Sequence, residues 1–189
     1  MVEKALRRLP AVPATEWHAQ WLKALPPATR MAFNGGAAAR AAALPIWGVP
    51  CSEEPLRANL RDARASLWLG PDEYLLLEFG AAAPLIEPLE QALGNIPHAV
   101  VDISHRQFAV EVSGPHASTI VSGACPLDLD LGEFPLGMCT RTVLAKADIV
   151  LWRTREDAFH VEVWRSFAGY VTGLLTEIAG EFYPARPAA

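Results

Sequence analysis

The sequence predicts an α+β fold of two ferredoxin-like-type halves, each an antiparallel sheet with helices on one face. A clear hairpin spans residues 65–79, where two apolar runs flank the turn Gly70-Pro71-Asp72. The hairpin pattern and the helix after it recur about 84 residues later, so that Leu67-Trp68 matches Leu151-Trp152. Upstream, residues 33–36 and the helix after them match residues 112–115 and their helix. These matches indicate an internal duplication.

The first half is expected over residues 29–104. It begins with a strand at residues 29–34, after which Gly35-Gly36 opens an Ala-rich helix that ends at Leu44, before Pro45. Residues 46–49 are expected to form a short strand and residues 50–63 a polar loop. After the hairpin comes a helix that Gly94 ends, and its apolar face is formed by Leu85, Ile86, Leu89 and Leu93.

The second half is expected over residues 105–183, joined to the first near residues 98–106. A strand at 98–103 ends the first half, and the elements of the second half are a strand at 107–113, a short helix at 115–124, a loop at 128–137, and strands at 142–145, 149–152 and 159–164. The last helix begins at Ser166 and has the strongest amphipathic pattern of the chain. Its apolar stripe is Phe167, Tyr170, Val171, Leu174, Leu175 and Ile178.

Residues 1–28 are expected to form an N-terminal arm or helix, and residues 184–189 a flexible tail. Within the arm, Trp17, Trp21 and Leu22 have the spacing of a short helix that Thr15 could cap. Two tryptophans on an arm are compatible with packing on the body of the chain and equally with docking on another subunit. Both interpretations stay open at this point.

The composition favours a folded protein with neither a nucleic acid nor a membrane as partner. Of the 189 residues 51% are hydrophobic, and the formal net charge of −5 argues against a phosphate-binding face. The positive residues near the start are not followed by an apolar segment, so no secretory signal is expected. No run approaches the ~20 apolar residues that cross a bilayer. A cytoplasmic protein is the default expectation.

The Asp, Ser, His and Cys residues that could act in catalysis or metal binding do not form a familiar motif. Asp102, Ser104, His105 and His116 invite a hydrolase interpretation, but no Gly-x-Ser-x-Gly elbow is present, and a polar turn at a strand end is the simpler reading. The histidines lack metal-ligand spacing, and no phosphate-binding glycine loop occurs. The three cysteines are expected to be buried free thiols. The sequence therefore predicts no catalytic, cofactor-binding or metal-binding residue.

Arginines gather around the last strands of the chain, at positions 141, 153, 155 and 165. Arginine is favoured at protein interfaces, so these side chains could face a partner. They could equally be the charged guard of a solvated sheet edge. The candidate interface residues are Trp17, Trp21, Arg141, Arg153, Arg155 and Arg165.

Six motifs in this order resemble the gamma subunit of bacterial heterotetrameric sarcosine oxidase. They are Leu67-Trp-Leu-Gly-Pro-Asp-Glu-Tyr-Leu-Leu76, Asp102-Ile-Ser-His-Arg106, Val112-Ser-Gly-Pro115, Cys125-Pro-Leu-Asp-Leu129, Phe134-Pro-x-Gly137-x-Cys139 and Arg165-Ser-Phe-Ala-x-Tyr170. The resemblance spans about residues 29–182, and residues 40–63 match less well. At a coarser level the pattern is similar to the aminomethyltransferase T-protein of glycine cleavage, which implies a T-protein-like fold.

The resemblance implies a subunit of a cytoplasmic flavoenzyme complex that demethylates sarcosine oxidatively to glycine, with formation of peroxide. The methyl carbon would leave as formaldehyde or pass to tetrahydrofolate. The implied partners are the alpha, beta and delta subunits: FAD, FMN, NAD and tetrahydrofolate belong to alpha and beta, and zinc to delta. The chain itself would be a non-catalytic structural scaffold. The alternatives are a free-standing folate-binding or one-carbon-transfer protein, with its site between the halves, and a homo-oligomeric interaction module.

Overall fold

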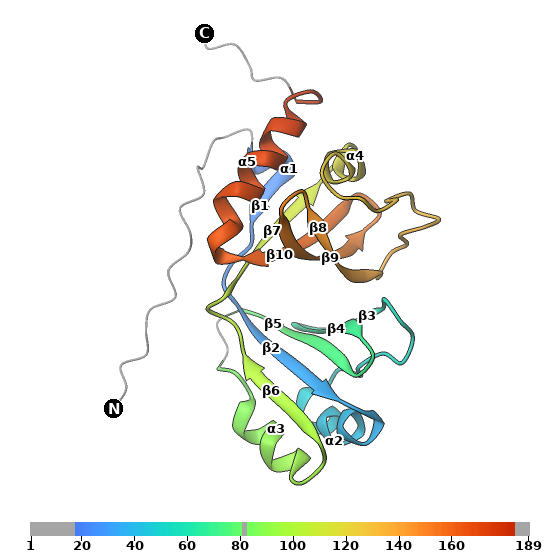
Figure 1. The fold of residues 1–189 in the computed structure, drawn as a ribbon, viewed down its shortest axis with the longest axis vertical. Helices are drawn as coiled ribbons and strands as arrows, with labels where there is room; N and C mark the ends of the chain where they lie inside the picture. Colours follow the sequence, from blue (N-terminus) through green and yellow to red (C-terminus); the bar gives the residue numbers. More distant parts are fainter. Residues whose placement is uncertain (1–17, 81–82, 184–189) are drawn as a thin grey trace, which may run out of the picture.

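The structure, a computed structural model, describes residues 18–80 and 83–183 and contains two five-stranded antiparallel sheets (Figure 1). The strands of one sheet, the N-sheet, are β2 (Ala28–Gly35), β3 (Ala58–Arg61), β4 (Arg64–Gly70), β5 (Glu73–Phe79) and β6 (His98–Asp102). The strands of the other, the C-sheet, are β1 (Leu22–Ala24), β7 (Gln107–Ser113), β8 (Cys139–Leu144), β9 (Ala147–Arg155) and β10 (Ala158–Trp164). The predicted α+β class is confirmed.

Helices cover one face of each sheet, and the two uncovered inner faces lie toward each other (Figure 1). The N-sheet carries α2 (Ala37–Trp47) and α3 (Ile86–Leu93), and the C-sheet carries α1 (His18–Trp21), α4 (Ala117–Ser122) and α5 (Ala168–Ala179). A 3-10 turn, Arg165–Phe167, joins β10 to α5. Among the described residues, no helix has both the length and the apolar character needed to cross a membrane. Trp17 and the predicted tail at residues 184–189 lie outside the described residues.

The chain follows the same path in both halves, which confirms the predicted duplication at the level of topology. The order strand, helix, three strands, helix occurs as β2-α2-β3-β4-β5-α3 and again as β7-α4-β8-β9-β10-α5. The two sheets have matching strand orders, β3-β4-β5-β2-β6 and β8-β9-β10-β7-β1. In the first half the chain continues into β6, which pairs with β2. In the second half the corresponding place beside β7 is taken by β1, which comes from the segment predicted as an arm.

The residue-by-residue match of the two hairpins is wrong, although the topology repeats. Trp68 packs against the outer core of the N-sheet, under its helices, whereas Trp152 lies in the layer between the two sheets. Leu67 and Leu151 also lie on opposite faces of their sheets, since Leu67 is in the layer between the sheets and Leu151 is in the helix-covered core. Neighbouring residues of a strand point to opposite faces, so a register error of one residue reverses every side chain. The true offset between the hairpins differs from 84 by an odd number of residues.

Helix α2 runs through Pro45, and the strand predicted at residues 46–49 is not present: Ile46 and Trp47 end the helix and Gly48 is its C-cap. Pro45 lies in the last turn, where its missing N–H removes one helical hydrogen bond. Burial of Trp47 offsets this loss, and its indole N–H donates to Ser66 Oγ at 2.8 Å. Gly48 then ends the helix with φ of 83° and donates its N–H to the Leu44 carbonyl. A buried aromatic anchor has overridden the local stop signal.

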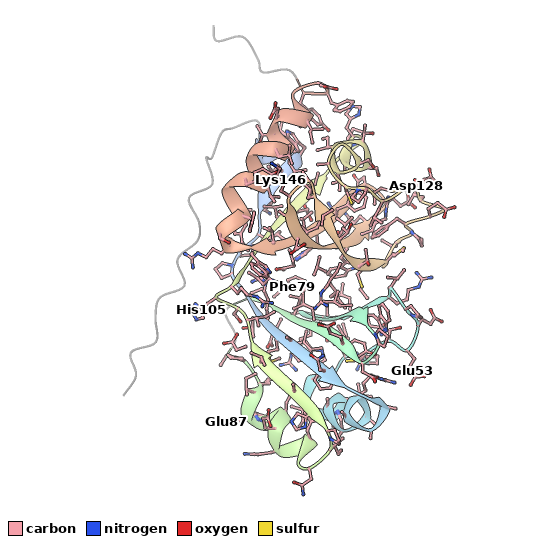
Figure 2. The ribbon with its side chains drawn as sticks, viewed as in Figure 1. Glu53, Phe79, Glu87, His105, Asp128 and Lys146 are labelled. Atoms are coloured by element: carbon pink, nitrogen blue, oxygen red, sulfur yellow. The ribbon has the colours of Figure 1, made fainter. Side chains whose placement is uncertain are left out.

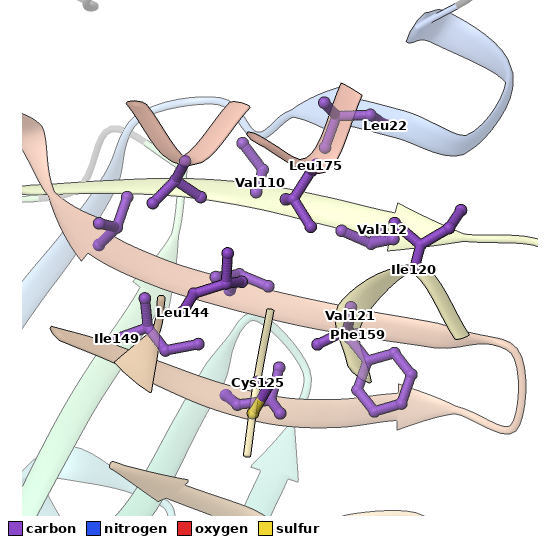
Figure 3. Close-up of a cluster of buried hydrophobic side chains, with 14 of the residues drawn as sticks. Leu22, Val110, Val112, Ile120, Val121, Cys125, Leu144, Ile149, Phe159 and Leu175 are labelled. Atoms are coloured by element: carbon purple, nitrogen blue, oxygen red, sulfur yellow. The ribbon is translucent and has the colours of Figure 1, made fainter. Parts of the chain in front are cut away.

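The core of the C-sheet lies between its outer face and helices α4 and α5 (Figure 3). Strand residues such as Val110 and Phe159 meet Ile120 of α4 and Leu175 of α5 there. The apolar stripe predicted for the last helix is only partly buried: Val171 and Leu175 are in the core, but Phe167 and Tyr170 are 37% and 40% exposed. The buried face is completed by the smaller Ala168, Thr172 and Ala179. The two aromatic side chains are therefore left on the surface.

Candidate functional site

The inner faces of the two sheets meet in one apolar layer. Phe79, labelled in Figure 2, lies at this junction, and its ring stacks on that of Trp152 with centroids 6.5 Å apart. The buried members of the layer are Ala65, Leu67, Leu75 and Leu77 of the N-sheet and Cys139, Val150 and Trp152 of the C-sheet. Both halves contribute side chains to this layer, so the layer holds the two halves together.

Two cavities lie between the sheets, one of about 440 Å³ and one of about 290 Å³. The lining of the larger cavity includes Tyr74, Arg106, Gln107, Arg141, Glu162 and Trp164. The lining of the smaller cavity includes Arg30, Phe79, Glu111, Trp152, Arg155 and His160. Because both sheets supply lining residues, either cavity depends on how the halves are joined.

A buried cluster of three ionisable side chains, Arg30, His160 and Glu162, connects the sheets. Arg30 of β2 donates from Nε to Glu162 Oε2 of β10 at 2.7 Å. The Nε2 of His160, two residues earlier on β10, lies 2.7 Å from Glu162 Oε1. All three side chains are at most 6% exposed. Glu162 lines the larger cavity, while Arg30 and His160 line the smaller one, so the ion cluster lies between the two cavities.

The electrostatics of Glu162 keep it ionised. Burial alone would raise the pKa of Glu162, but the charge of Arg30 and the hydrogen bond with His160 outweigh it, so the pKa lies below its ordinary value. Both carboxylate oxygens are engaged by these two partners. This geometry is that of a cross-link between two halves, in which the carboxylate charge is neutralised by a neighbouring cation.

The residues considered as a hydrolytic set are not arranged as one. Ser104 Oγ donates to Asp102 Oδ1 at 2.5 Å and accepts the backbone N–H of Arg30 at 2.9 Å. His105 is exposed and lies at the edge of the molecule (Figure 2). His116 stacks on Phe182 with ring centroids 5.0 Å apart. Ser104 thus closes a turn after β6 and ties it to β2, as the simpler reading expects.

Two of the predicted interface residues are buried in this chain. Trp21 is 1% exposed and stacks on Tyr183, with ring centroids 5.9 Å apart. Arg153 is also 1% exposed, and its guanidinium lies over the Phe159 ring and donates to the Leu129 carbonyl. Arg153 therefore holds the loop after α4 against β9. Neither side chain is on the surface, and for Trp21 intramolecular packing is the interpretation that the structure supports.

The other three predicted arginines lie at the surface but do not form one patch. Arg141 of β8, which lines the larger cavity, pairs with Glu73 of β5 across the two sheets. That hydrogen-bonded pair lowers the pKa of Glu73. Arg155 pairs with Glu111 at the smaller cavity. Arg165 is half-buried at the start of the 3-10 turn. Their role at an interface stays a prediction.

The cysteines are free thiols, as expected, and the pKa values of two of them are strongly raised. Burial raises the pKa of Cys139 to about 12, and its thiol faces the Trp68 carbonyl. Burial also raises the pKa of Cys51 to about 11. A thiolate is the reactive form of cysteine, so these environments disfavour nucleophilic chemistry.

Cys139 is expected to be almost inert in the native protein. In a Cys51→Ser/Cys125→Ser variant at pH 8, modification of Cys139 by an aromatic disulfide reagent should be on the order of a hundredfold slower than that of a free thiol. The absorbance of the released thiolate measures this rate. The same variant in urea is the control and should react at once. Rapid reaction without denaturant would contradict the buried placement.

The buried charges are the residues that sequence reasoning missed. No motif in the sequence marks His160, yet it is 4% exposed and lies between the sheets. His160 and Glu162 occupy alternate positions of a strand whose other face is apolar, which indicates a common face but not its burial. Within residues 18–80 and 83–183, no three His, Cys, Asp or Glu side chains are grouped so that they could hold a metal ion.

Comparison with known proteins assigns the chain to a family. The family model described as sarcosine oxidase, gamma subunit family, matches residues 35–181. Gamma subunits of sarcosine oxidase from Corynebacterium sp. strains U-96 and P-1 are each 34% identical to the chain, over 88% and 79% of its length and 77% and 72% of theirs.

Solved structures give the same family and a more distant likeness of fold. A chain of the heterotetrameric sarcosine oxidase from Corynebacterium sp. U-96, in complex with pyrrole 2-carboxylate, matches with a TM-score of 0.80 and 29% identity. The match covers 88% of this chain and 87% of that chain. The glycine cleavage system aminomethyltransferase T from Bartonella henselae matches with a TM-score of 0.60 and 15% identity, over 82% of this chain and 44% of its own. The expected T-protein-like fold is thereby confirmed.

Proposed function

The chain belongs to the sarcosine oxidase gamma subunit family, and from this premise we propose that it is a non-catalytic structural subunit of a heterotetrameric sarcosine oxidase. Its proposed partners are the alpha, beta and delta subunits. The observation that carries the proposal is the match to a chain of a solved heterotetramer, at a TM-score of 0.80 over most of both chains.

The geometry of the buried polar groups supports a structural role. Both oxygens of Glu162 are engaged by Arg30 and His160, and the Ser104 hydroxyl is engaged by Asp102. Burial raises the pKa of Cys139 to about 12, which opposes its ionisation. Glu162 and Cys139 therefore belong to the junction of the halves, and Ser104 fixes a turn of the N-sheet, which is what a rigid scaffold for other subunits needs.

The reaction proposed for the whole complex is the oxidative demethylation of sarcosine. Sarcosine, O₂ and water give glycine, formaldehyde and H₂O₂: the N-methyl group loses two electrons, and O₂ accepts them. In the presence of tetrahydrofolate the carbon is instead transferred to that carrier as a methylene group. FAD, FMN, NAD and tetrahydrofolate are proposed to bind to the alpha and beta subunits, so this chain acts through assembly alone.

Co-expression of the four subunits from the native host tests the proposal. A tagged copy of this chain should recover a yellow complex of four chains that forms peroxide when sarcosine is added. The chain purified alone should be colourless and should form no peroxide. Omission of this chain should lower the yield of assembled, flavin-bearing complex. Sarcosine oxidation by the isolated chain would contradict the non-catalytic role.

The same purified chain separates the alternatives. Binding of tetrahydrofolate by the isolated chain, measured by calorimetry, would favour the free-standing one-carbon protein. A native mass of two or more copies without any partner would favour the homo-oligomeric module. A tagged chain that recovers none of the other subunits would overturn the proposed function.

A further inference from the structure

Three aromatic side chains lie exposed where β10 passes into α5. Trp164 is 45% exposed, Phe167 37% and Tyr170 40%. The Phe167 and Tyr170 rings meet edge to face, with centroids 6.4 Å apart. Scattered exposed apolar residues are ordinary, but a cluster of Trp, Phe and Tyr is the composition enriched in protein interfaces. Phe167 and Tyr170 of this cluster also belong to the predicted apolar stripe of the last helix, but they do not enter the core.

Two arginines lie beside the aromatic cluster. The Arg106 guanidinium lies over the Trp164 ring, 5.5 Å from its centroid. The Arg165 backbone N–H donates to the Arg106 carbonyl at 2.8 Å, which fixes the turn after β6 to the end of β10. In the part of the chain that the structure describes, the ion pairs include neither arginine. A chain of net charge −5 therefore has a local positive surface here.

The surface continues into the larger cavity. Arg106 and Trp164 both belong to the cavity lining, with Gln107 next to them. The Oε1 of Gln107 is buried and has no hydrogen-bond partner within the described residues. A side chain that enters the cavity past Trp164 would therefore meet walls with both apolar and charged side chains, such as Ile149 and Glu162, and an unused acceptor. The hot-spot residues of protein interfaces are often Trp, Tyr and Arg, and they cluster around pockets that exclude water.

We propose that Arg106, Trp164, Arg165, Phe167 and Tyr170, here called the aromatic–arginine surface, are the contact site for another subunit of the complex. The partner segment presents apolar side chains to the three rings and carboxylates to the two arginines. One side chain of the segment, with an N–H or O–H group that donates to Gln107 Oε1, enters the larger cavity. This inference rests on the proposed function and adds the location and chemistry of the contact.

Charge complementarity favours a different subunit at this surface over a second copy of the chain and over residues 1–17 of the chain itself. In a symmetric dimer the same surface of two copies would meet, so that two surfaces of like positive charge would be brought together. Residues 1–17 of the chain carry more basic than acidic side chains, so they do not complement the surface either. An acidic segment of a different subunit satisfies the arginines and covers the rings together. It also gains affinity from the cation–π pair of Arg106 and Trp164, which becomes stronger when water is excluded.

The test measures affinity for the other subunits. The subcomplex without this chain is purified, and the full-length chain is titrated into it by calorimetry. Trp164→Ala and Phe167→Ala should each raise the dissociation constant about tenfold or more, as hot-spot truncations do. Arg106→Glu should raise it further and reduce its dependence on salt, because an attractive charge pair becomes repulsive.

Matched controls come from exposed residues elsewhere on the chain. Leu136→Ala removes a side chain that is 55% exposed, and Lys146→Glu reverses an exposed charge at the β8–β9 turn, labelled in Figure 2. Both should leave the dissociation constant within twofold, and all variants should unfold at the wild-type temperature.

The outcomes separate the inference from the proposed function. If the wild-type chain does not bind the subcomplex, the proposed function fails. If the wild type binds and the surface variants bind equally well, this inference alone is overturned. It is also overturned if the isolated wild-type chain is a dimer that Trp164→Ala converts to a monomer without any change in subcomplex binding.

Discussion

Replacement of Glu162 by alanine is expected to lower the free energy of unfolding by about 3–5 kcal/mol, because it leaves the buried Arg30 charge without a partner. The Arg30 side chain is 4% exposed and that of His160 6%. Water therefore has little access to the cation that remains. Urea unfolding followed by tryptophan fluorescence measures the change. A loss below about 1 kcal/mol, the value typical of a surface pair, would contradict the burial of the cluster.

A double variant identifies the cause of the loss. In Arg30→Met/Glu162→Leu both charges are removed and similar volumes are kept, so most of the lost stability should return. The surface pair Arg141–Glu73, with side chains 52% and 30% exposed, provides the comparison. Glu73→Gln should cost less than about 1 kcal/mol. If the double variant were as unstable as Glu162→Ala, the cause would be lost packing and not an uncompensated charge.

The contribution of Glu162 depends on pH in a defined direction. The pKa of Glu162 is lowered in the folded protein, so the unfolded chain takes up a proton first as the pH falls. Its stabilisation is fully present above the unfolded pKa, about 4.3, and is lost as the pH falls through the lower folded value. The difference in unfolding free energy between wild type and Glu162→Gln should thus be constant near pH 7 and shrink below about pH 4. A constant difference down to pH 3 would contradict the lowered pKa.

Local patterns were enough to predict most elements of this fold. The hairpin of β4 and β5 follows from two apolar runs around Gly70-Pro71-Asp72, and α3 follows from its apolar face and Gly94. Local rules failed where tertiary contacts override them. Pro45 marks a helix end in the sequence, yet burial of Trp47 carries α2 one turn further.

The candidate site was largely beyond sequence reasoning, because its groups come together only in the fold. Arg30 and Glu162 are separated by 132 positions and lie on different sheets. The pattern of β10 shows that His160 and Glu162 share a face, but whether that face meets water or a second sheet depends on the packing of the halves. Likewise, the period of α5 places Phe167 and Tyr170 on its apolar side, while the smaller Ala168 and Ala179 are the residues that reach the sheet.

Replacement of Trp152 by alanine is expected to lower the free energy of unfolding by about 3–5 kcal/mol, the cost of deleting a large buried ring. Trp152 is 4% exposed, and its ring lies 6.5 Å from that of Phe79 and 5.8 Å from that of His160. Trp152→Phe keeps most of the volume and should lose clearly less. Leu131→Ala, at a position 46% exposed, is the control and should change the value by less than about 0.5 kcal/mol.

The same variant tests whether the inner layer makes the two halves one cooperative unit. Trp152 of the C-sheet packs with Leu67, Leu75 and Leu77 of the N-sheet, so its removal weakens the contact between the halves more than either outer core. The helix-covered cores of the two sheets stay intact in Trp152→Ala, and each half can then unfold at its own denaturant concentration. A broader urea transition with a smaller apparent slope is the expected result. A sharp transition of unchanged slope would show that the ion cluster of Arg30, His160 and Glu162 suffices to couple the sheets.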